Sequence, residues 1–80
     1  MDEFVKRLIA IQQEQKLFDG DMAEKIGCSR QLYQMTRTNQ APLGLVIIRG
    51  GLRAFPGDRE LIKGAALWIR DGADAGKVKA

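Results

Sequence analysis

The spacing of apolar residues is the feature that most constrains how this chain can fold. In residues 2–15, polar positions alternate with an apolar set at helical spacing: Phe4, Val5, Leu8, Ile9 and Ile11. A helix that buries one face has this period, and Asp2 suits its N-cap. The pattern returns in four further short segments, which are separated by glycines, prolines and capping residues. The sequence therefore predicts an all-α fold, a compact bundle of about five short helices.

A break in the pattern precedes a second, short helix. Leu17 and Phe18 are expected to anchor the turn, and either Asp19 or Asp21 is placed to cap the helix that follows. Asp21 with Glu24 three residues later fits a capping box in which Asp replaces the usual Ser or Thr.

The third helix follows after a very short connection. Gly27 suits the end of the second helix, because glycine adopts the left-handed conformation without strain, and Ser29 suits the N-cap of a helix over residues 30–38. Only Gly27, Cys28 and Ser29 separate the two helices, so they must meet at a steep angle. Two short helices joined by such a turn form a helix-turn-helix, which we expect at residues 19–38 in the centre of the bundle.

Residues 43–55 are open to two interpretations. A helical stripe is formed by Leu45, Ile48, Leu52 and Phe55. Pro42 suits the first position of this helix, although Gly50 and Gly51 would each cost a helix about 1 kcal/mol relative to alanine. The alternative is an α+β fold with a hairpin at 45–55 that turns at the two glycines. The helix is favoured because its spacing continues across them.

The last helix is predicted to begin after Asp58 as N-cap and to end at Gly72. Its apolar stripe consists of Leu61, Ile62, Ala65, Trp68 and Ile69. Residues 73–80 are mostly small and charged. We expect one domain over residues 1–72 and a disordered tail over residues 73–80.

Charge is distributed unevenly along the chain. The formal net charge is +3, yet residues 1–24 contain six acids against three bases, whereas residues 25–57 contain no acid. That middle segment has five basic residues: Lys25, Arg30, Arg37, Arg49 and Arg53. An acid-free basic segment indicates a face that meets an anion, most often nucleic acid, although a solvated basic surface would give the same pattern.

The side-chain inventory excludes several classes of function. With no histidine and only Cys28, the chain alone can form no structural zinc site, no Cys/His nucleophile pair and no internal disulfide. Cys28 is expected to be a small core residue. Nothing supports catalysis, so we expect no enzyme, no metal and no cofactor. The start MDEFVKRLIA has acids where a signal peptide needs bases, and apolar runs such as residues 45–48 are far short of the ~20 residues that span a bilayer, so we expect a cytoplasmic protein without membrane contact.

The segment DGDMAEKIGCSRQLYQMTRT, residues 19–38, resembles the helix-turn-helix of Xre-type regulators, the Cro and repressor class of phages and bacteria. The likeness rests on Ala23 four residues before Gly27, on the string AEKIG, and on Ser29 and Arg30 at the start of the recognition helix. The order of the helices fits as well. The resemblance implies a lambda-repressor-like bundle in which Ala23 lets the third helix approach the second and Gly27 makes the turn.

The chain departs from this family at two places. Phe18 and Asp19 stand where the family usually has a Ser/Thr cap and a Gln that touches phosphate, and an aspartate would repel phosphate, so that contact is not expected. In the third helix the family's buried positions correspond to Tyr33 and Thr36, whereas the apolar spacing of this chain selects Cys28, Leu32 and Met35. Either register leaves four residues facing outward: Arg30, Gln31, Gln34 and Arg37.

The resemblance implies binding to double-stranded DNA, with the helix over residues 30–38 in the major groove. Arginine bonds bidentately to guanine and glutamine to adenine, so three residues are the expected base readers: Arg30, Gln31 and Gln34. Five residues at the ends of the helix are expected to contact phosphates: Ser29, Arg37, Thr38, Asn39 and Gln40.

These features predict a transcriptional regulator of phage or mobile-element type, expected to be a repressor. One helix-turn-helix reads only a few base pairs, so we expect a homodimer through the last helix on a two-fold site. The alternative is a protein-interaction module, an adaptor or antitoxin-like subunit on the same helical fold. Asp19 and the glycine-rich segment 43–55 favour this alternative.

Overall fold

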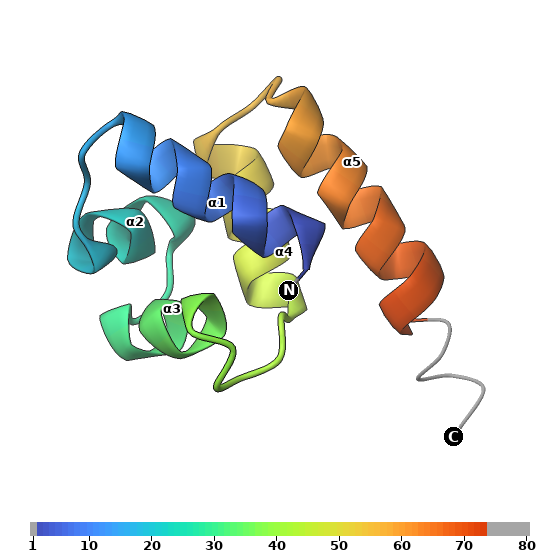
Figure 1. The fold of residues 1–80 in the computed structure, drawn as a ribbon, viewed down its shortest axis with the longest axis horizontal. Coiled ribbons are helices and arrows are strands. Elements are labelled where there is room, and N and C mark those ends of the chain that lie inside the picture. The colour runs from blue at the N-terminus through green and yellow to red at the C-terminus, as the bar shows by residue number, and fades with distance from the viewer. Residues whose placement is uncertain (1, 74–80) are drawn as a thin grey trace.

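The computed structural model describes residues 2–73 and shows them as helices joined by short loops (Figure 1). Within this range there are five α-helices followed by a π-helical turn, and no strand. Their bounds are α1 (Glu3–Glu14), α2 (Asp19–Ile26), α3 (Arg30–Arg37), α4 (Leu45–Ala54), α5 (Arg59–Leu67) and η1 (Trp68–Ala73). The predicted all-α bundle is confirmed. The alternative hairpin at 45–55 is wrong, because that segment is helical.

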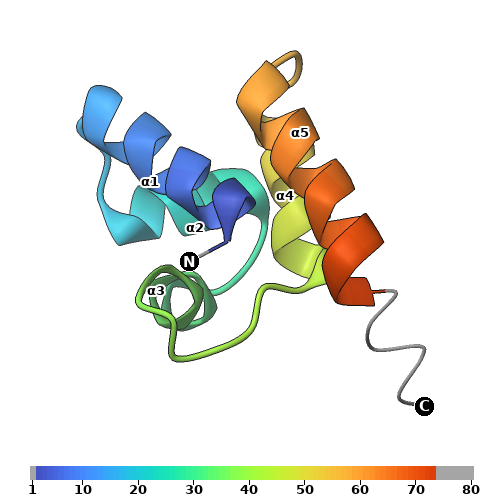
Figure 2. The same cartoon turned by 45° about the vertical axis from the view of Figure 1, so that its right-hand side comes forward.

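The helices pack around one apolar core. α1 packs against α5, and α2 packs against both α3 and α4. Figure 2 shows α1 and α2 on one side, α4 and α5 on the other, and α3 below them, where the loop over residues 38–44 begins. The largest fully buried side chains are Tyr33, Phe4, Leu8, Met22, Ile26, Ile47 and Leu61. Every α-helix contributes to this set, so the position of α3 is set by the same core as the rest.

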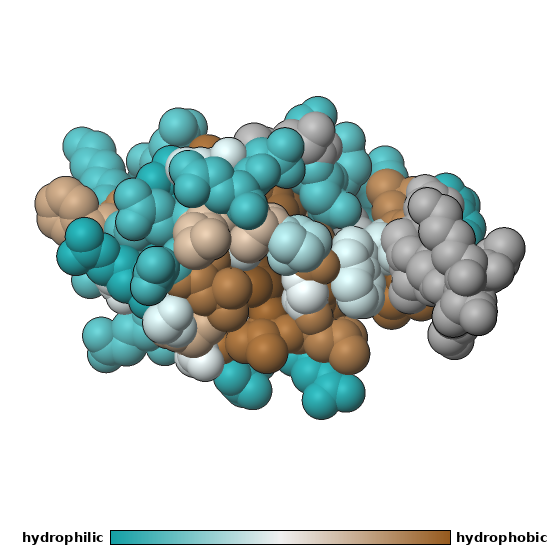
Figure 3. All heavy atoms as spheres, turned by 90° about the horizontal axis from the view of Figure 1, so that it is seen from below, coloured by the Kyte–Doolittle hydropathy of each residue, from teal (hydrophilic) through white to brown (hydrophobic). Residues whose placement is uncertain are grey.

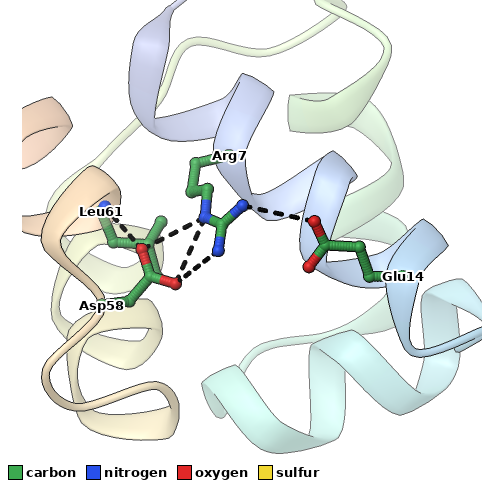
Figure 4. A network of polar contacts seen from close by, with 4 residues as sticks. All are labelled: Arg7, Glu14, Asp58 and Leu61. Carbon is green, nitrogen blue, oxygen red and sulfur yellow. Dashed lines mark hydrogen bonds and ion pairs between the residues drawn. The ribbon is translucent and has the colours of Figure 1, made fainter.

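α1 is joined to the start of α5 by a polar network (Figure 4). The guanidinium of Arg7 donates from Nε to both carboxylate oxygens of Asp58, each at 3.2 Å, and from Nη2 to Oδ2 at 2.9 Å. Asp58 is also the N-cap of α5, and its Oδ1 accepts from the backbone N–H of Leu61 at 3.0 Å. The bonds from Arg7 lower the pKa of the Asp58 carboxyl, so one carboxylate both caps α5 and pairs with α1.

α4 is a helix despite its adjacent glycines, and the glycines face the core. Its buried residues are Ile47, Ile48, Gly50 and Gly51. A Cβ atom on Gly50 would overlap the carbonyl oxygen of Ile26 and stand 2.5 Å from its Cγ2, and one on Gly51 would stand 2.8 Å from Cζ of Phe4. Three members of the predicted stripe do meet the core, since Ile48 is buried and Leu52 and Phe55 pack against it. Leu45 is 52% exposed, because α4 turns its glycine face inward to approach α1 and α2 closely.

The prediction that Pro42 opens this helix is also wrong. α4 begins at Leu45, and its N-cap is Gly44, which has an extended backbone with φ −128° and ψ 175°. Pro42 is exposed in the loop, and Leu43 packs against the core. The backbone is still extended at Gly44, so the helix begins only at Leu45.

α5 buries a narrower stripe than predicted. Three members of the predicted stripe contact the core: Leu61, Ala65 and Trp68. The other two are more than half exposed, Ile62 at 51% and Ile69 at 54%. Gly64 is buried and faces inward, and a Cβ atom there would lie 2.8 Å from the backbone N and Cα of Phe4. The close contact of α5 with α1 thus rests on a missing side chain.

The end of the last helix differs from the prediction as well. Gly72 does not stop it, because α5 continues as the π-helical turn η1 through Ala73. The predicted disordered tail over residues 73–80 lies outside the described residues except for Ala73, which ends this turn.

The start of α2 is capped differently from the prediction. Phe18 is the N-cap, and Asp21 at the third helical position accepts a hydrogen bond from the backbone N–H of Phe18 at 3.0 Å. Neither an aspartate cap nor a capping box of Asp21 with Glu24 is formed. The side chain of Phe18 is 81% exposed and does not anchor the turn, whereas Leu17 packs against the core.

Candidate nucleic-acid interface

The connection between α2 and α3 has the geometry of a tight helix-turn-helix. Gly27 has a φ of 91°, in the left-handed region that glycine adopts without strain, and its backbone N–H donates to the carbonyl oxygen of Ala23 at 2.8 Å. The N–H of Cys28 donates to the same oxygen at 3.0 Å. Ser29 is the N-cap of α3, and its Oγ accepts from the N–H of Leu32 at 3.0 Å. Ala23 is buried on α2, which packs against α3.

α3 buries Tyr33 and Thr36, which are 2% and 5% exposed. The register selected by apolar spacing is therefore wrong, since its members Cys28, Leu32 and Met35 are only half-buried. Two hydrogen bonds make this burial of polar residues possible. The hydroxyl of Thr36 donates to the carbonyl oxygen of Leu32 at 2.9 Å, and the hydroxyl of Tyr33 donates to Oε1 of Gln12 at 2.7 Å.

The inward turn of Tyr33 and Thr36 leaves one polar face of α3 open to solvent. All three expected base readers are exposed: Arg30, Gln31 and Gln34. Four of the five expected phosphate contacts are exposed too: Ser29, Thr38, Asn39 and Gln40. Two of these have structural duties. Thr38 caps the end of α3 and its hydroxyl donates to the carbonyl oxygen of Gln34 at 2.8 Å, and Asn39 has a φ of 64°, a left-handed conformation that asparagine tolerates.

Arg37 does not face outward as predicted. Its Nη2 donates to Oδ2 of Asp19 at 2.8 Å, its side chain is 30% exposed, and its Nε is buried without a hydrogen-bond partner among residues 2–73. Asp19 and Arg37 are far apart in sequence, and the two meet only because α2 and α3 cross. The side chain of Arg37, which was expected to contact phosphate, is thus paired with Asp19 within the molecule.

Asp19 is the centre of a polar network that fixes α3 to α1 and α2. Its Oδ1 accepts from Nε2 of Gln12 at 3.0 Å, while Oε1 of the same glutamine accepts from Tyr33. Burial alone would raise the pKa of Asp19, but the hydrogen bonds from Arg37 and Gln12 outweigh it and the pKa is lowered. Burial, aided by the nearby charge of Asp19, raises the pKa of Tyr33 to about 12. At neutral pH the network therefore holds a neutral phenol and an ionised carboxylate.

Sequence reasoning did not find this network. Gln12 lies on a surface position of the first amphipathic pattern, and nothing in its neighbourhood marks it as a partner of Tyr33 and Asp19. The one available signal was the departure from the family pattern at Asp19, whose charge is opposite to that of Arg37 on α3.

Arg30 lies beside the start of α2. It lines a shallow hollow together with Phe18, Asp19, Gly20 and Asp21. Its Cδ is 3.8 Å from the position that a Cβ atom on Gly20 would take, and its charge helps to lower the pKa of Asp19. The aliphatic part of the Arg30 side chain thus lies close to the start of α2.

Apolar side chains are also exposed elsewhere on the surface. Seen from below, the molecule has an apolar area at the centre of its underside (Figure 3). Among the described residues, five large apolar side chains are more than half exposed: Phe18, Leu45, Val46, Ile62 and Ile69. Four of them lie on α4, α5 and η1, and Phe18 lies at the start of α2.

No family model, curated protein or solved structure matches this sequence. Among residues 2–73 there is no group of three or more His, Cys, Asp or Glu side chains that could hold a metal ion. None of the helices in that part of the chain combines the length and apolar character needed to cross a membrane.

Proposed function

We propose that this chain is a sequence-specific, double-stranded DNA-binding regulator of the Xre type, a repressor that places α3 in the major groove. The observation that carries the proposal is the exposed polar face of α3, with Arg30, Gln31 and Gln34 projecting after a tight turn at Gly27. A single helix fits the major groove, and arginine and glutamine are the side chains best suited to purine edges there. Such a regulator acts in the cytoplasm.

The charges around α3 support attraction to a polyanion. Residues 25–57 contain no acid. Asp19, an acid at the start of α2, has its charge balanced by Arg37 at 2.8 Å. Phosphate contacts are assigned to Ser29, Thr38, Asn39 and Gln40, whereas Arg37, whose charge is paired with that of Asp19, is not counted among them.

A homodimer is part of the proposal. One helix-turn-helix reads a single half-site, and two-fold pairing places two recognition helices about one DNA turn, or about 34 Å, apart. The more than half-exposed Ile62 and Ile69, on α5 and η1, are apolar groups that a second copy could cover.

The salt dependence of duplex binding tests the proposal. Fluorescence anisotropy with a labelled random-sequence duplex should give measurable binding at about 50 mM salt and a loss of at least tenfold in affinity at about 200 mM, because bound Lys and Arg release counterions. Gln31→Ala should narrow the gap between specific and random DNA, with Gln13→Ala on the exposed surface of α1 as the matched control. No binding at low salt, or binding indifferent to salt, would refute the proposal.

The second candidate is a protein-interaction module on the same fold. Phe18, 81% exposed where the Xre pattern has a small polar cap, favours it, because a large exposed aromatic side chain is typical of protein interfaces. A stoichiometric partner that remains bound through purification, together with duplex binding unchanged by Arg30→Ala and Gln34→Ala, would support this candidate over the first.

A further inference from the structure

α4 has an outward face that is exposed to solvent. Its inward face contains the two buried isoleucines and the two adjacent glycines. Four residues of α4 are exposed: Leu45, Val46, Arg49 and Arg53. Leu45, Arg49 and Arg53 follow one another at intervals of four residues, so they lie in one line along the helix, and Val46 is three residues before Arg49. These four exposed residues are called the outer stripe of α4.

The outer stripe is apolar at its start and basic at its end. Leu45 and Val46 are 52% and 55% exposed. Arg49 and Arg53 form no ion pair with the acids of residues 2–73. Nη2 of Arg53 donates to the carbonyl oxygen of Ile26 at 3.2 Å, which places this guanidinium at the end of α2, where Lys25 is also exposed. The basic end of the stripe thus has positive charge that no carboxylate of this part of the chain neutralises.

This combination of groups favours a protein partner over nucleic acid. A phosphate backbone would satisfy Arg49 and Arg53, but it has no apolar surface to cover Leu45 and Val46. An amphipathic helix with acids and apolar side chains on one face covers both kinds of group. Two carboxylates four residues apart on such a helix are separated by about 6 Å along its axis, the same rise that separates Arg49 from Arg53.

A second copy of the chain does not offer this pattern. No two of its acids are four residues apart in the sequence. Charge complementarity therefore favours a different protein as the occupant of the outer stripe.

We infer that the outer stripe of α4 docks an acidic amphipathic helix of a partner protein. Its carboxylates pair with Arg49 and Arg53, and its apolar side chains cover Leu45 and Val46. The inference goes beyond the proposed function, because the stripe contains none of the residues assigned to DNA. α4 runs upward from the loop that follows α3 in both views (Figures 1 and 2), so the basic end of the stripe lies further from α3 than the apolar end.

Selection of displayed peptides tests the inference without knowledge of the partner. A random library of peptides about four helical turns long is displayed on phage and selected on the immobilised full chain. The enriched peptides should contain two Asp or Glu residues four positions apart, with apolar residues on the same helical face. One enriched peptide is then synthesised with a fluorescent label for anisotropy measurements.

The affinity of this peptide should fall by about tenfold or more on Arg49→Glu, because an attraction becomes a repulsion, and by about threefold or more on Val46→Gln. Lysine in place of the peptide carboxylate that faces position 49 should weaken binding to the wild type and restore binding to Arg49→Glu. A merely structural effect of the substitution would show no such rescue.

Arg59→Glu is the matched control, because it makes the same change in net charge at an exposed position of α5 outside the outer stripe. It should change the affinity for the peptide by less than about twofold. Circular dichroism checks that each variant is folded.

Three results would overturn the inference. The first is the absence of enriched peptides, or enriched peptides that bind Arg49→Glu and Val46→Gln as tightly as the wild type. The second is a loss of duplex affinity in Arg49→Glu that greatly exceeds the loss in Arg59→Glu, which would assign the stripe to nucleic acid. The third is a dimer in sedimentation that Val46→Gln dissociates, which would assign the stripe to a second copy. A wild-type chain that binds the peptide but no duplex would refute the proposed function and leave this inference standing.

Discussion

The contacts of α4 and α5 with α1 and α2 differ in kind from those that hold α3. α4 and α5 approach their neighbours through glycines, and Cβ atoms on Gly50, Gly51 and Gly64 would stand 2.8 Å or less from atoms of Ile26 or Phe4. Backbone lies against backbone or against a ring, so no flexible side chain is available to give way.

α3 is held by side chains. Tyr33 and Thr36 are its buried residues, and the hydrogen bonds of Tyr33, Gln12, Asp19 and Arg37 join it to α1 and α2. Such bonds each contribute about 0.5–3 kcal/mol, whereas a clash between backbones cannot be relieved without moving a helix. We therefore expect the glycine contacts to tolerate no added atom, and the attachment of α3 to weaken in graded steps.

The largest effect is expected from Gly50→Ala. Its Cβ atom would overlap the carbonyl oxygen of Ile26, and the gain of about 1 kcal/mol in helix propensity is smaller than the overpacking cost of about 3 kcal/mol or more. Because small domains have a free energy of unfolding near 5 kcal/mol, the variant should be largely unfolded or strongly destabilised in urea denaturation followed by circular dichroism.

Gly20→Ala is the matched control for this comparison. Gly20 is also helical, but its nearest neighbour to an added Cβ is Cδ of Arg30 at 3.8 Å, an ordinary contact. This variant should be as stable as the wild type or more stable by about 0.5–1 kcal/mol. Equal destabilisation by both substitutions would show that the close contact with Ile26 is not the reason why position 50 requires glycine.

The two kinds of contact also differ in how far the sequence reveals them. Local signals predicted five helices and the caps at Asp2, Ser29 and Asp58, because a cap and the helix it serves are a few residues apart. The glycines on the inward faces of α4 and α5 were missed, since apolar spacing counts side chains and gives no weight to a residue that has none. Gly50 and Gly64 were taken for a cost to the helix or passed over.

The candidate site was likewise predicted only in part from the sequence. The exposed positions of Gln31 and Gln34 were expected under either register of α3, whereas the burial of Tyr33 and Thr36 agrees with the register of the family resemblance and not with the apolar spacing. The engagement of Arg37 by Asp19 was missed because the pair is formed by the crossing of α2 and α3. A single sequence does not state which surface charges meet.

The next largest effect is expected from Asp19→Ala, which leaves the half-buried guanidinium of Arg37 without its carboxylate. Urea denaturation at pH 7 should show a loss of about 1 kcal/mol, since the pair is partly exposed to solvent. Glu24→Ala, an exposed acid on the same helix, is the control and should be close to neutral. The loss should disappear in the background of Arg37→Ala if the pair is its cause.

The pH dependence of the free energy of unfolding tests the same interaction between Asp19 and Arg37. The pKa of Asp19 is lower in the folded chain than its ordinary value of 3.8, so its contribution is present above that value and is lost as the pH falls through the depressed folded pKa. The difference in stability between wild type and Asp19→Ala should therefore shrink between about pH 5 and pH 2. A difference that is constant over this range would contradict a role for the ionised carboxylate.

The smallest effect on stability is expected from Tyr33→Phe, which keeps the buried ring and removes only the bond from the hydroxyl to Gln12 at 2.7 Å. A loss of about 0.5 kcal/mol at pH 7, the low end for one neutral hydrogen bond, should be seen in urea denaturation. Gln12 retains its bond to Asp19, so the rest of the network stays formed.

The wild-type chain allows the same contact to be observed without mutation, because Tyr33 is its one tyrosine. Absorbance titration of the folded protein should give a midpoint near 12, against about 10 in urea, since burial and the charge of Asp19 both disfavour the phenolate. The folded-state pKa is the higher one, so the contribution of Tyr33 is complete below pH 10 and is lost as the pH rises toward 12. A midpoint near 10 under folded conditions would mean that the hydroxyl is open to solvent and that its bond to Gln12 does not help to hold α3.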